Sequence, residues 1–238
     1  MRQKLLKPDG TEIVDLEEAV RSPISPFADK KLLMRTFDSS NVADIMARCL
    51  VEIYPICQGD DIEKRLTQRV NDYIAVENFE IAVNLLWQLT LAEVDRKRTD
   101  KQEERIFELT LKIIRATEEK YAHRESFEKA LDILVGIIRR HPSLYSLRDD
   151  SVRVLLKRLF LSYQEGVEYD ILTNIAILAG SMNDKYLLSF FRDFYQKEKE
   201  ALRGVPTGVF YLTHNNERYL LLGMLFHIIA NFEEDMGQ

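Results

Sequence analysis

From about residue 40 onward, apolar residues recur along this chain at intervals of three and four, and this spacing limits the fold more than any other feature. Such a period places the apolar side chains on one face of an α-helix. The 238 residues include only 9 Gly and 6 Pro, so few positions interrupt the pattern. The sequence therefore predicts an all-α fold made of packed amphipathic helices.

Capping signals divide this pattern into successive helices. Asp60 is followed by Glu63, and Thr99 is followed by Gln102, and both pairs are typical of a helix N-terminus. The segment 171–179 is apolar on nearly all sides, which indicates a central helix. The helical stripes comprise residues 42–56, 62–73, 79–89, 106–114, 127–138, 152–163, 171–179, 187–194 and 219–232.

The spacing of the helices resembles that of a known class of repeat protein. Alternate helices are expected to begin near residues 41, 77, 124, 168 and 216, at steps of roughly 36 to 48 residues. With one antiparallel pair in each step, residues 40–234 resemble an α-solenoid of the HEAT or armadillo type. The resemblance rests on spacing alone, because the proline and the Asp and Arg positions of the HEAT consensus do not recur. It implies stacked helix pairs, and an irregular helical domain remains the alternative.

The first 38 residues differ from the rest. Residues 7–10 (KPDG) lie between two short apolar segments and are typical of a β-hairpin turn. Residues 22–26 contain two prolines, which predict an extended chain. We therefore divide the sequence into an N-terminal arm with a hairpin, residues 1–38, and a helical domain, residues 39–238. A second strand-like segment, residues 209–212, precedes the last helix.

The spacing of the polar residues matches no catalytic or metal site. Glu119 and His123 are four residues apart, but a surface ion pair explains that spacing without a metal. The carboxylates of residues 60–63 stand where a helix begins and favour its dipole. Phosphate-binding glycine loops and the nucleophile elbow are absent from the sequence. We expect no catalytic, cofactor-binding or metal-binding residues and a non-enzymatic protein, although a site assembled from scattered residues remains open.

Charge and hydropathy indicate a cytoplasmic protein without a membrane partner. The net charge of −6 argues against a general affinity for nucleic acid. The longest apolar stretch, residues 219–232, is too short to span a bilayer, and residues 1–8 lack the apolar core of a signal peptide. On a continuous helix, Cys49 and Cys57 would lie roughly 12 Å apart, which is too far for a disulfide.

Two groups of side chains are candidate binding sites. Aromatic residues cluster late in the chain, and those left outside the core would mark a protein interface. Basic residues gather within 96–105, 139–141 and 153–158, and an aligned set would suit a phosphate backbone. The candidate protein-interface residues are Phe191, Tyr195, Phe210 and Tyr211, and the candidate nucleic-acid contacts are Arg96, Lys97, Arg98, Arg139, Arg140, Arg153, Lys157 and Arg158.

Taken together, these features favour a non-enzymatic adaptor or assembly subunit that binds another protein or a second copy of itself. A helical-repeat protein that associates with nucleic acid is the alternative. An isolated hairpin is only marginally stable. The arm is therefore expected to dock on the helical body, on a partner chain or on another protein, and the sequence does not choose among these.

Overall fold

The computed structural model describes residues 30–54, 60–91, 98–118, 120–141, 144, 149–166, 169–181, 185–201 and 216–236. These residues form ten α-helices and one short 3-10 turn, and no strand occurs among them, so the all-α prediction is confirmed. The predicted hairpin turn at residues 7–10 and the strand-like segment 209–212 lie outside the described residues.

The chain divides into two compact units, residues 1–133 and residues 134–238. The first unit contains α2 (Lys30–Ser39), α3 (Ala43–Ile53), α4 (Asp60–Ala75), α5 (Phe79–Leu91), α6 (Asp100–Thr117), the 3-10 turn η1 (Tyr121–His123) and the start of α7 (Arg124–Arg140). The second unit contains the end of α7, α9 (Asp149–Gly166), α10 (Tyr169–Ser181), α11 (Lys185–Ala201) and α12 (Asn216–Met236). Helix α2 begins inside the predicted arm, residues 1–38.

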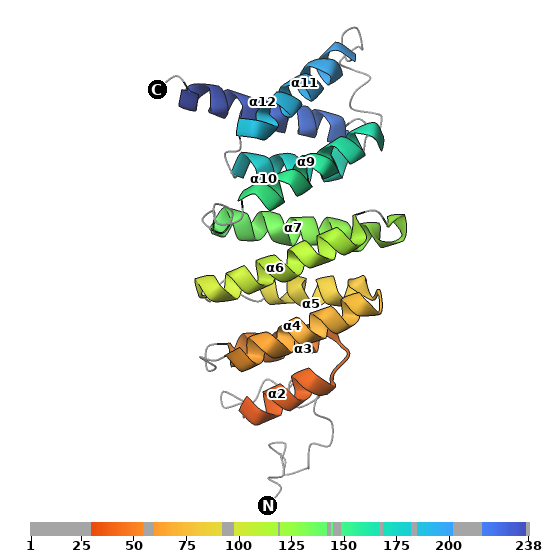
Figure 1. The fold of residues 1–238 in the computed structure, drawn as a ribbon, viewed down its shortest axis with the longest axis vertical. Helices are drawn as coiled ribbons and strands as arrows, with labels where there is room; N and C mark the ends of the chain where they lie inside the picture. Colours follow the sequence, from red (N-terminus) through yellow and green to blue (C-terminus); the bar gives the residue numbers. More distant parts are fainter. Residues whose placement is uncertain are drawn as a thin grey trace, which may run out of the picture. The chain divides into compact units, whose positions relative to one another are not determined.

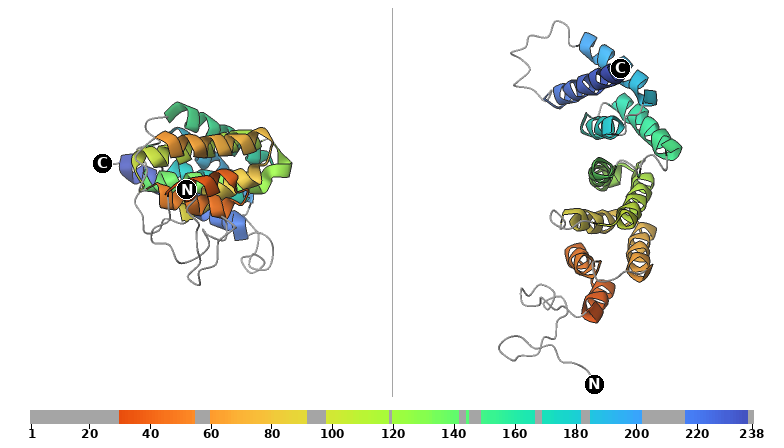
Figure 2. Two further views of the ribbon diagram at one scale, coloured as in Figure 1. Left: turned by 90° about the horizontal axis from the view of Figure 1, so that it is seen from below. Right: turned by 90° about the vertical axis from the view of Figure 1, so that its left-hand side faces the viewer.

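The helices of the first unit pack in two layers (Figures 1 and 2). Helix α3 packs against α5 in one layer, and α4 packs against α6 in the other. Helix α2 packs against α3, and α5 contacts both α4 and α6. Neighbours within a layer are therefore two helices apart in the sequence.

The apolar stripes predicted from the sequence form the core of this unit. On α4, Ile62, Leu66 and Val70 are completely buried, as their spacing predicts. On α5, Phe79 and Leu86 are buried as well. Each such side chain contributes about 1.5–3 kcal/mol relative to an exposed one, so burial of these stripes dominates the stability of the layers.

The predicted capping box at the start of α6 is confirmed. The backbone N–H of Gln102 donates to the side-chain oxygen of Thr99 at 3.3 Å, and the backbone N–H of Thr99 donates to Oε1 of Gln102 at 2.8 Å. The N–H of Thr99 thereby gains an acceptor that the helix backbone does not provide, while the N–H of Gln102 also donates to the carbonyl oxygen of Thr99 at 2.9 Å.

Glu77 lies in the left-handed region, with φ of 56°, in the turn between α4 and α5. The N–H of Glu77 donates to the carbonyl of Ile74, and the N–H of Asn78 donates to that of Tyr73, which is the Schellman arrangement that usually places glycine at this position. Lys120 donates to the Glu77 carboxylate at 2.5 Å. This hydrogen bond and the charge of Lys120 lower the pKa of Glu77 below its ordinary range.

We predict that Glu77→Gly raises the free energy of unfolding by about 1 kcal/mol, because glycine adopts a positive φ without the steric cost of a Cβ. The matched control is Glu77→Ala, which removes the same exposed ion pair but keeps the Cβ. It should lower the free energy of unfolding slightly, since surface pairs contribute little. Urea unfolding followed by circular dichroism measures both free energies. Equal effects of the two substitutions would contradict the inference that the positive φ of Glu77 strains the backbone.

Helix α10 is the central helix of the second unit. It packs against α9 and α12, and α11 packs against α12 (Figure 1). Its side chains Ile171, Ile175 and Leu178 are completely buried, which confirms the prediction for residues 171–179. Where α10 meets α12, a Cβ built on Gly180 would lie 2.9 Å from Cγ1 of Ile228, so the two helices approach too closely for a larger residue.

A pair of glycine substitutions tests this close approach. We predict that Gly180→Ala lowers the free energy of unfolding by about 1–3 kcal/mol, because Ile228 or the helix backbone must shift. Gly223 of α12 is exposed, and a Cβ added there would meet no atom within 4 Å. Gly223→Ala should therefore raise the free energy of unfolding by about 0.5–1 kcal/mol through helix propensity alone. Urea unfolding should show changes of opposite sign in the free energy of unfolding of the two variants. An unchanged free energy for Gly180→Ala would contradict the close approach of α10 and α12 at this residue.

Candidate functional site

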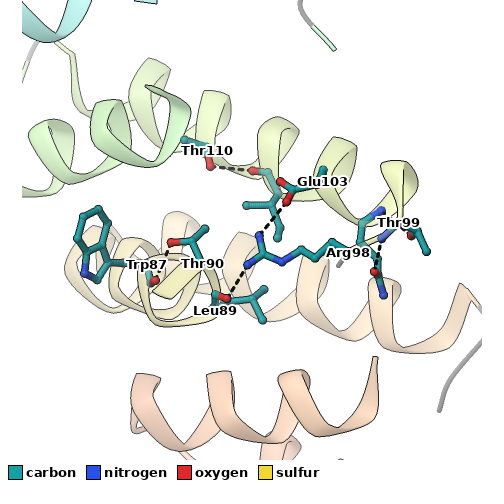
Figure 3. Close-up of polar contacts among 9 residues, drawn as sticks. Trp87, Leu89, Thr90, Arg98, Thr99, Glu103 and Thr110 are labelled. Atoms are coloured by element: carbon teal, nitrogen blue, oxygen red, sulfur yellow. Dashed lines mark hydrogen bonds and ion pairs between the residues drawn. The ribbon is translucent and has the colours of Figure 1, made fainter. Parts of the chain in front are cut away.

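The side chain of Arg98, one of the candidate nucleic-acid contacts, is buried and makes two polar contacts (Figure 3). Its Nη1 lies 3.3 Å from Oε1 of Glu103, and its Nη2 donates to the carbonyl oxygen of Leu89 at 2.7 Å. Both charged side chains are 3% exposed. Arg98 therefore joins the end of α5 to the start of α6, and this burial removes it from the surface that a phosphate backbone could reach.

The other basic candidates have different environments. Arg96 and Lys97 lie outside the described residues. Arg139 and Arg140 are exposed in the last turn of α7, where basic side chains also favour the helix dipole. On α9, which belongs to the same unit, the surface basic residues are Arg153, Lys157 and Arg158.

The aromatic candidates separate into core and surface. Phe191 is 1% exposed and packs edge to face on Phe160, with ring centroids 5.0 Å apart, so it belongs to the core and not to an interface. Phe194 packs on the same ring at 5.6 Å. Tyr195 is half-buried and keeps access to solvent. Phe210 and Tyr211 lie outside the described residues.

Tyr195 borders an exposed apolar surface of α12. Its ring lies 6.4 Å from that of Phe226, and the Lys199 ammonium lies 5.6 Å from the centre of the Tyr195 ring. Phe226 is 53% exposed, and Leu220, on the same helix, is 67% exposed. We define the α12 patch as Tyr195 of α11 together with Leu220, Gly223, Phe226 and His227 of α12, all of which are exposed or half-buried.

The α12 patch results from a helix that is apolar on two sides. Leu221, Leu225 and Ile228 are buried and form the core side of α12. Leu220 and Phe226 project from the other side, where a surface helix normally carries polar residues. The sequence predicts this helix to be buried because most of its sides are apolar. That prediction is wrong for this side, and Leu220 and Phe226 are further candidate interface residues, which the sequence analysis did not single out.

No three His, Cys, Asp or Glu side chains among the described residues are placed to hold a metal ion. Cys49 is completely buried among apolar helices, and Glu198, also buried, accepts a hydrogen bond from the Tyr169 hydroxyl at 3.1 Å. None of the described helices is both long and apolar enough to cross a bilayer.

No known protein family, curated sequence or solved structure matches the chain.

The buried pair of Arg98 and Glu103 gives a stability prediction. We expect Arg98→Met to lower the free energy of unfolding by about 3 kcal/mol, because it removes the Arg98 cation from beside the buried Glu103 carboxylate. The double variant Arg98→Met with Glu103→Met should lose less than Arg98→Met alone, since no buried charge remains. Urea unfolding of the wild-type chain, the single variant and the double variant measures these free energies. A loss below about 0.5 kcal/mol for Arg98→Met would indicate a solvated, surface arginine.

Proposed function

We propose that this chain is a non-enzymatic adaptor or assembly subunit that binds another protein through the α12 patch. The observation that carries the proposal is the exposure of two large apolar side chains of α12: Leu220, and Phe226, whose ring lies beside the half-buried ring of Tyr195. Large apolar and aromatic side chains grouped on a surface are typical of protein interfaces. Burial of each of the two exposed side chains in a partner would contribute about 1.5–3 kcal/mol to binding.

The proposed architecture is a short α-solenoid-like stack of helix pairs. Two features support it: the two layers of the first unit, and the packing of α3 with α5 and of α4 with α6. In stacks of this kind each pair contacts its neighbours, which leaves long surfaces available for binding. An irregular helical domain remains the alternative architecture. The proposal keeps the N-terminal arm, residues 1–38, with its predicted hairpin turn at residues 7–10, as a further docking element.

A cytoplasmic location, which the charge and hydropathy of the sequence indicate, is part of the proposal. Association with nucleic acid ranks second. Burial of Arg98 weakens it, and Arg139, Arg140 and Arg158 remain exposed. Binding to nucleic acid would weaken steeply with added salt, whereas apolar docking at the α12 patch would not.

The proposal predicts that Leu220→Ser with Phe226→Ser reduces recovery of a protein partner at least tenfold, because both apolar contacts are lost. The measurement is affinity capture by the full chain from native cytoplasm, quantified by mass spectrometry and accompanied by sedimentation analysis for self-association. Val76→Ser is the matched control, since Val76 is 71% exposed but lies in the first unit.

Wild-type and Val76→Ser chains should recover the same partner in stoichiometric amount. Circular dichroism and thermal unfolding should show that the double variant keeps its helices, since both substituted side chains are largely exposed. Unchanged recovery by the folded double variant would reject the α12 patch as the binding surface. Recovery of nucleic acid in place of protein would support the second-ranked function.

A further inference from the structure

The exposed side of α12 alternates large and small residues. Leu220 is exposed, and Gly223, one turn further, carries no side chain. His227 is exposed and Ala230 is half-buried on the same side of the helix. Because these four residues follow one another at intervals of three or four, they form one line along the helix. In chain order they are large, small, large and small.

This line of residues is complementary to itself when the helix is reversed. An antiparallel pair of α12 helices centred on residue 225 places Leu220 of one copy level with Ala230 of the other. It also places His227 level with Gly223, and a two-fold axis repeats both contacts. Each large side chain therefore opposes a small residue, as the side chains of packed helices do. Phe226 lies nearest this centre, so the two Phe226 rings approach each other at the axis.

Packing within the chain does not account for Gly223. A Cβ built on this residue would meet no atom within 4 Å, and the backbone here is helical. Glycine disfavours the interior of a helix because its backbone loses the most freedom on folding. A second helix that crosses at Gly223 gives the residue a role, since the distance between two helix axes depends on the side chains at their contact.

The charges of α12 also suit a second, antiparallel copy. Residues 219–232 include no Asp, Glu, Lys or Arg, so a two-fold contact at their centre brings no like charges together. The last turn of α12 contains Glu233, Glu234 and Asp235 and no basic residue, although carboxylates there oppose the helix dipole. An antiparallel copy brings to this end its own first turn, which contains Arg218 and the positive end of its dipole.

We propose that the protein bound by the α12 patch is a second copy of this chain, and that the two α12 helices pack antiparallel about a two-fold axis. The proposal rests on the proposed function, since it names the partner at the same surface. A different protein would need its own matching series of large and small residues, whereas a second copy already has it. Homodimer interfaces are also the most apolar class of protein interface, in agreement with this side of α12.

The test measures the dissociation constant of the purified full chain by sedimentation equilibrium. We expect a reversible monomer–dimer equilibrium with a Kd of about 1–100 µM. Gly223→His should raise the Kd about tenfold or more, because two histidines then meet where one histidine met a glycine. His227→Ala should raise the Kd about fivefold or more, because the contact with Gly223 of the other copy is lost.

A mixture of these two variants tests the pairing itself. In a mixed dimer, the native histidine of the Gly223→His chain meets Gly223, and its introduced histidine meets the introduced alanine. Each large residue again opposes a small one, so the Kd of the mixed dimer should lie within about threefold of the wild-type value. A fluorescent label on one of the two chains identifies the mixed dimer in the sedimentation profile.

The matched control is Ala75→His, which adds a histidine at an exposed residue of α4 in the first unit. It should leave the Kd within about twofold of the wild-type value. Thermal unfolding of each variant establishes that it is folded, as the exposure of Gly223 and His227 leads us to expect. Gly223→Ala should stabilise the single chain and weaken the dimer, a pair of effects that helix propensity alone does not produce.

Three results would overturn the proposal. They are a wild-type chain that stays monomeric at about 1 mM, a dimer whose Kd does not respond to Gly223→His, and a mixture that pairs no better than each variant alone.

The proposed function can fail or stand separately from this pairing. If the chain is monomeric but captures a different protein, and Leu220→Ser with Phe226→Ser abolishes that capture, the pairing is overturned and the proposed function is supported. If the dimer responds as expected and affinity capture recovers only this chain, the pairing is supported and the proposed function is limited to self-assembly.

Discussion

The packing of α5 against α3, α4 and α6 is the contact on which the first unit depends. Both ends of this apolar helix are held by neighbouring elements. At its start, the Phe79 ring meets His123 edge to face at 4.7 Å and lies under the Lys120 ammonium. At its end, the carbonyl oxygen of Leu89 accepts a hydrogen bond from Arg98. Apolar burial supplies most of the stability, and these end contacts fix the helix in one position along its axis.

The second unit uses its aromatic residues in two different ways. Phe160, Phe191 and Phe194 fill the space between α9 and α11. Tyr195 and Phe226, although they also lie near each other, remain in contact with solvent. The same unit thus contains a closed aromatic core and an open aromatic surface, and only the second is available to a partner.

Much of the fold could be predicted from the sequence because amphipathic helices reveal which side they bury. Ile62, Leu66 and Val70 were identifiable by spacing, and the capping box at Thr99 by its residue types. The surface of α12 could not be predicted, because a helix that is apolar on most sides carries no periodic signal. The sequence also could not show that Phe191 is buried while Tyr195 is half-buried, because the two residues are four apart and lie on the same side of α11. Only the packing of α9 and α12 distinguishes them.

The burial of the Arg98 side chain could not be predicted from the sequence either. Arg98 lies among charged residues, and such a segment is normally exposed to solvent. Its position has a consequence for how the protein can change over evolutionary time. Arg98 contacts the carbonyl oxygen of Leu89 at the end of α5 and the carboxylate of Glu103 at the start of α6. These two contacts hold the helices in register, and they do not depend on the number of residues in the connection at 92–97. Insertions in that connection would add only about 0.6 kcal/mol of closure entropy for each doubling of its length. Homologous chains can therefore differ most in length at this place while keeping the two helices in the same alignment.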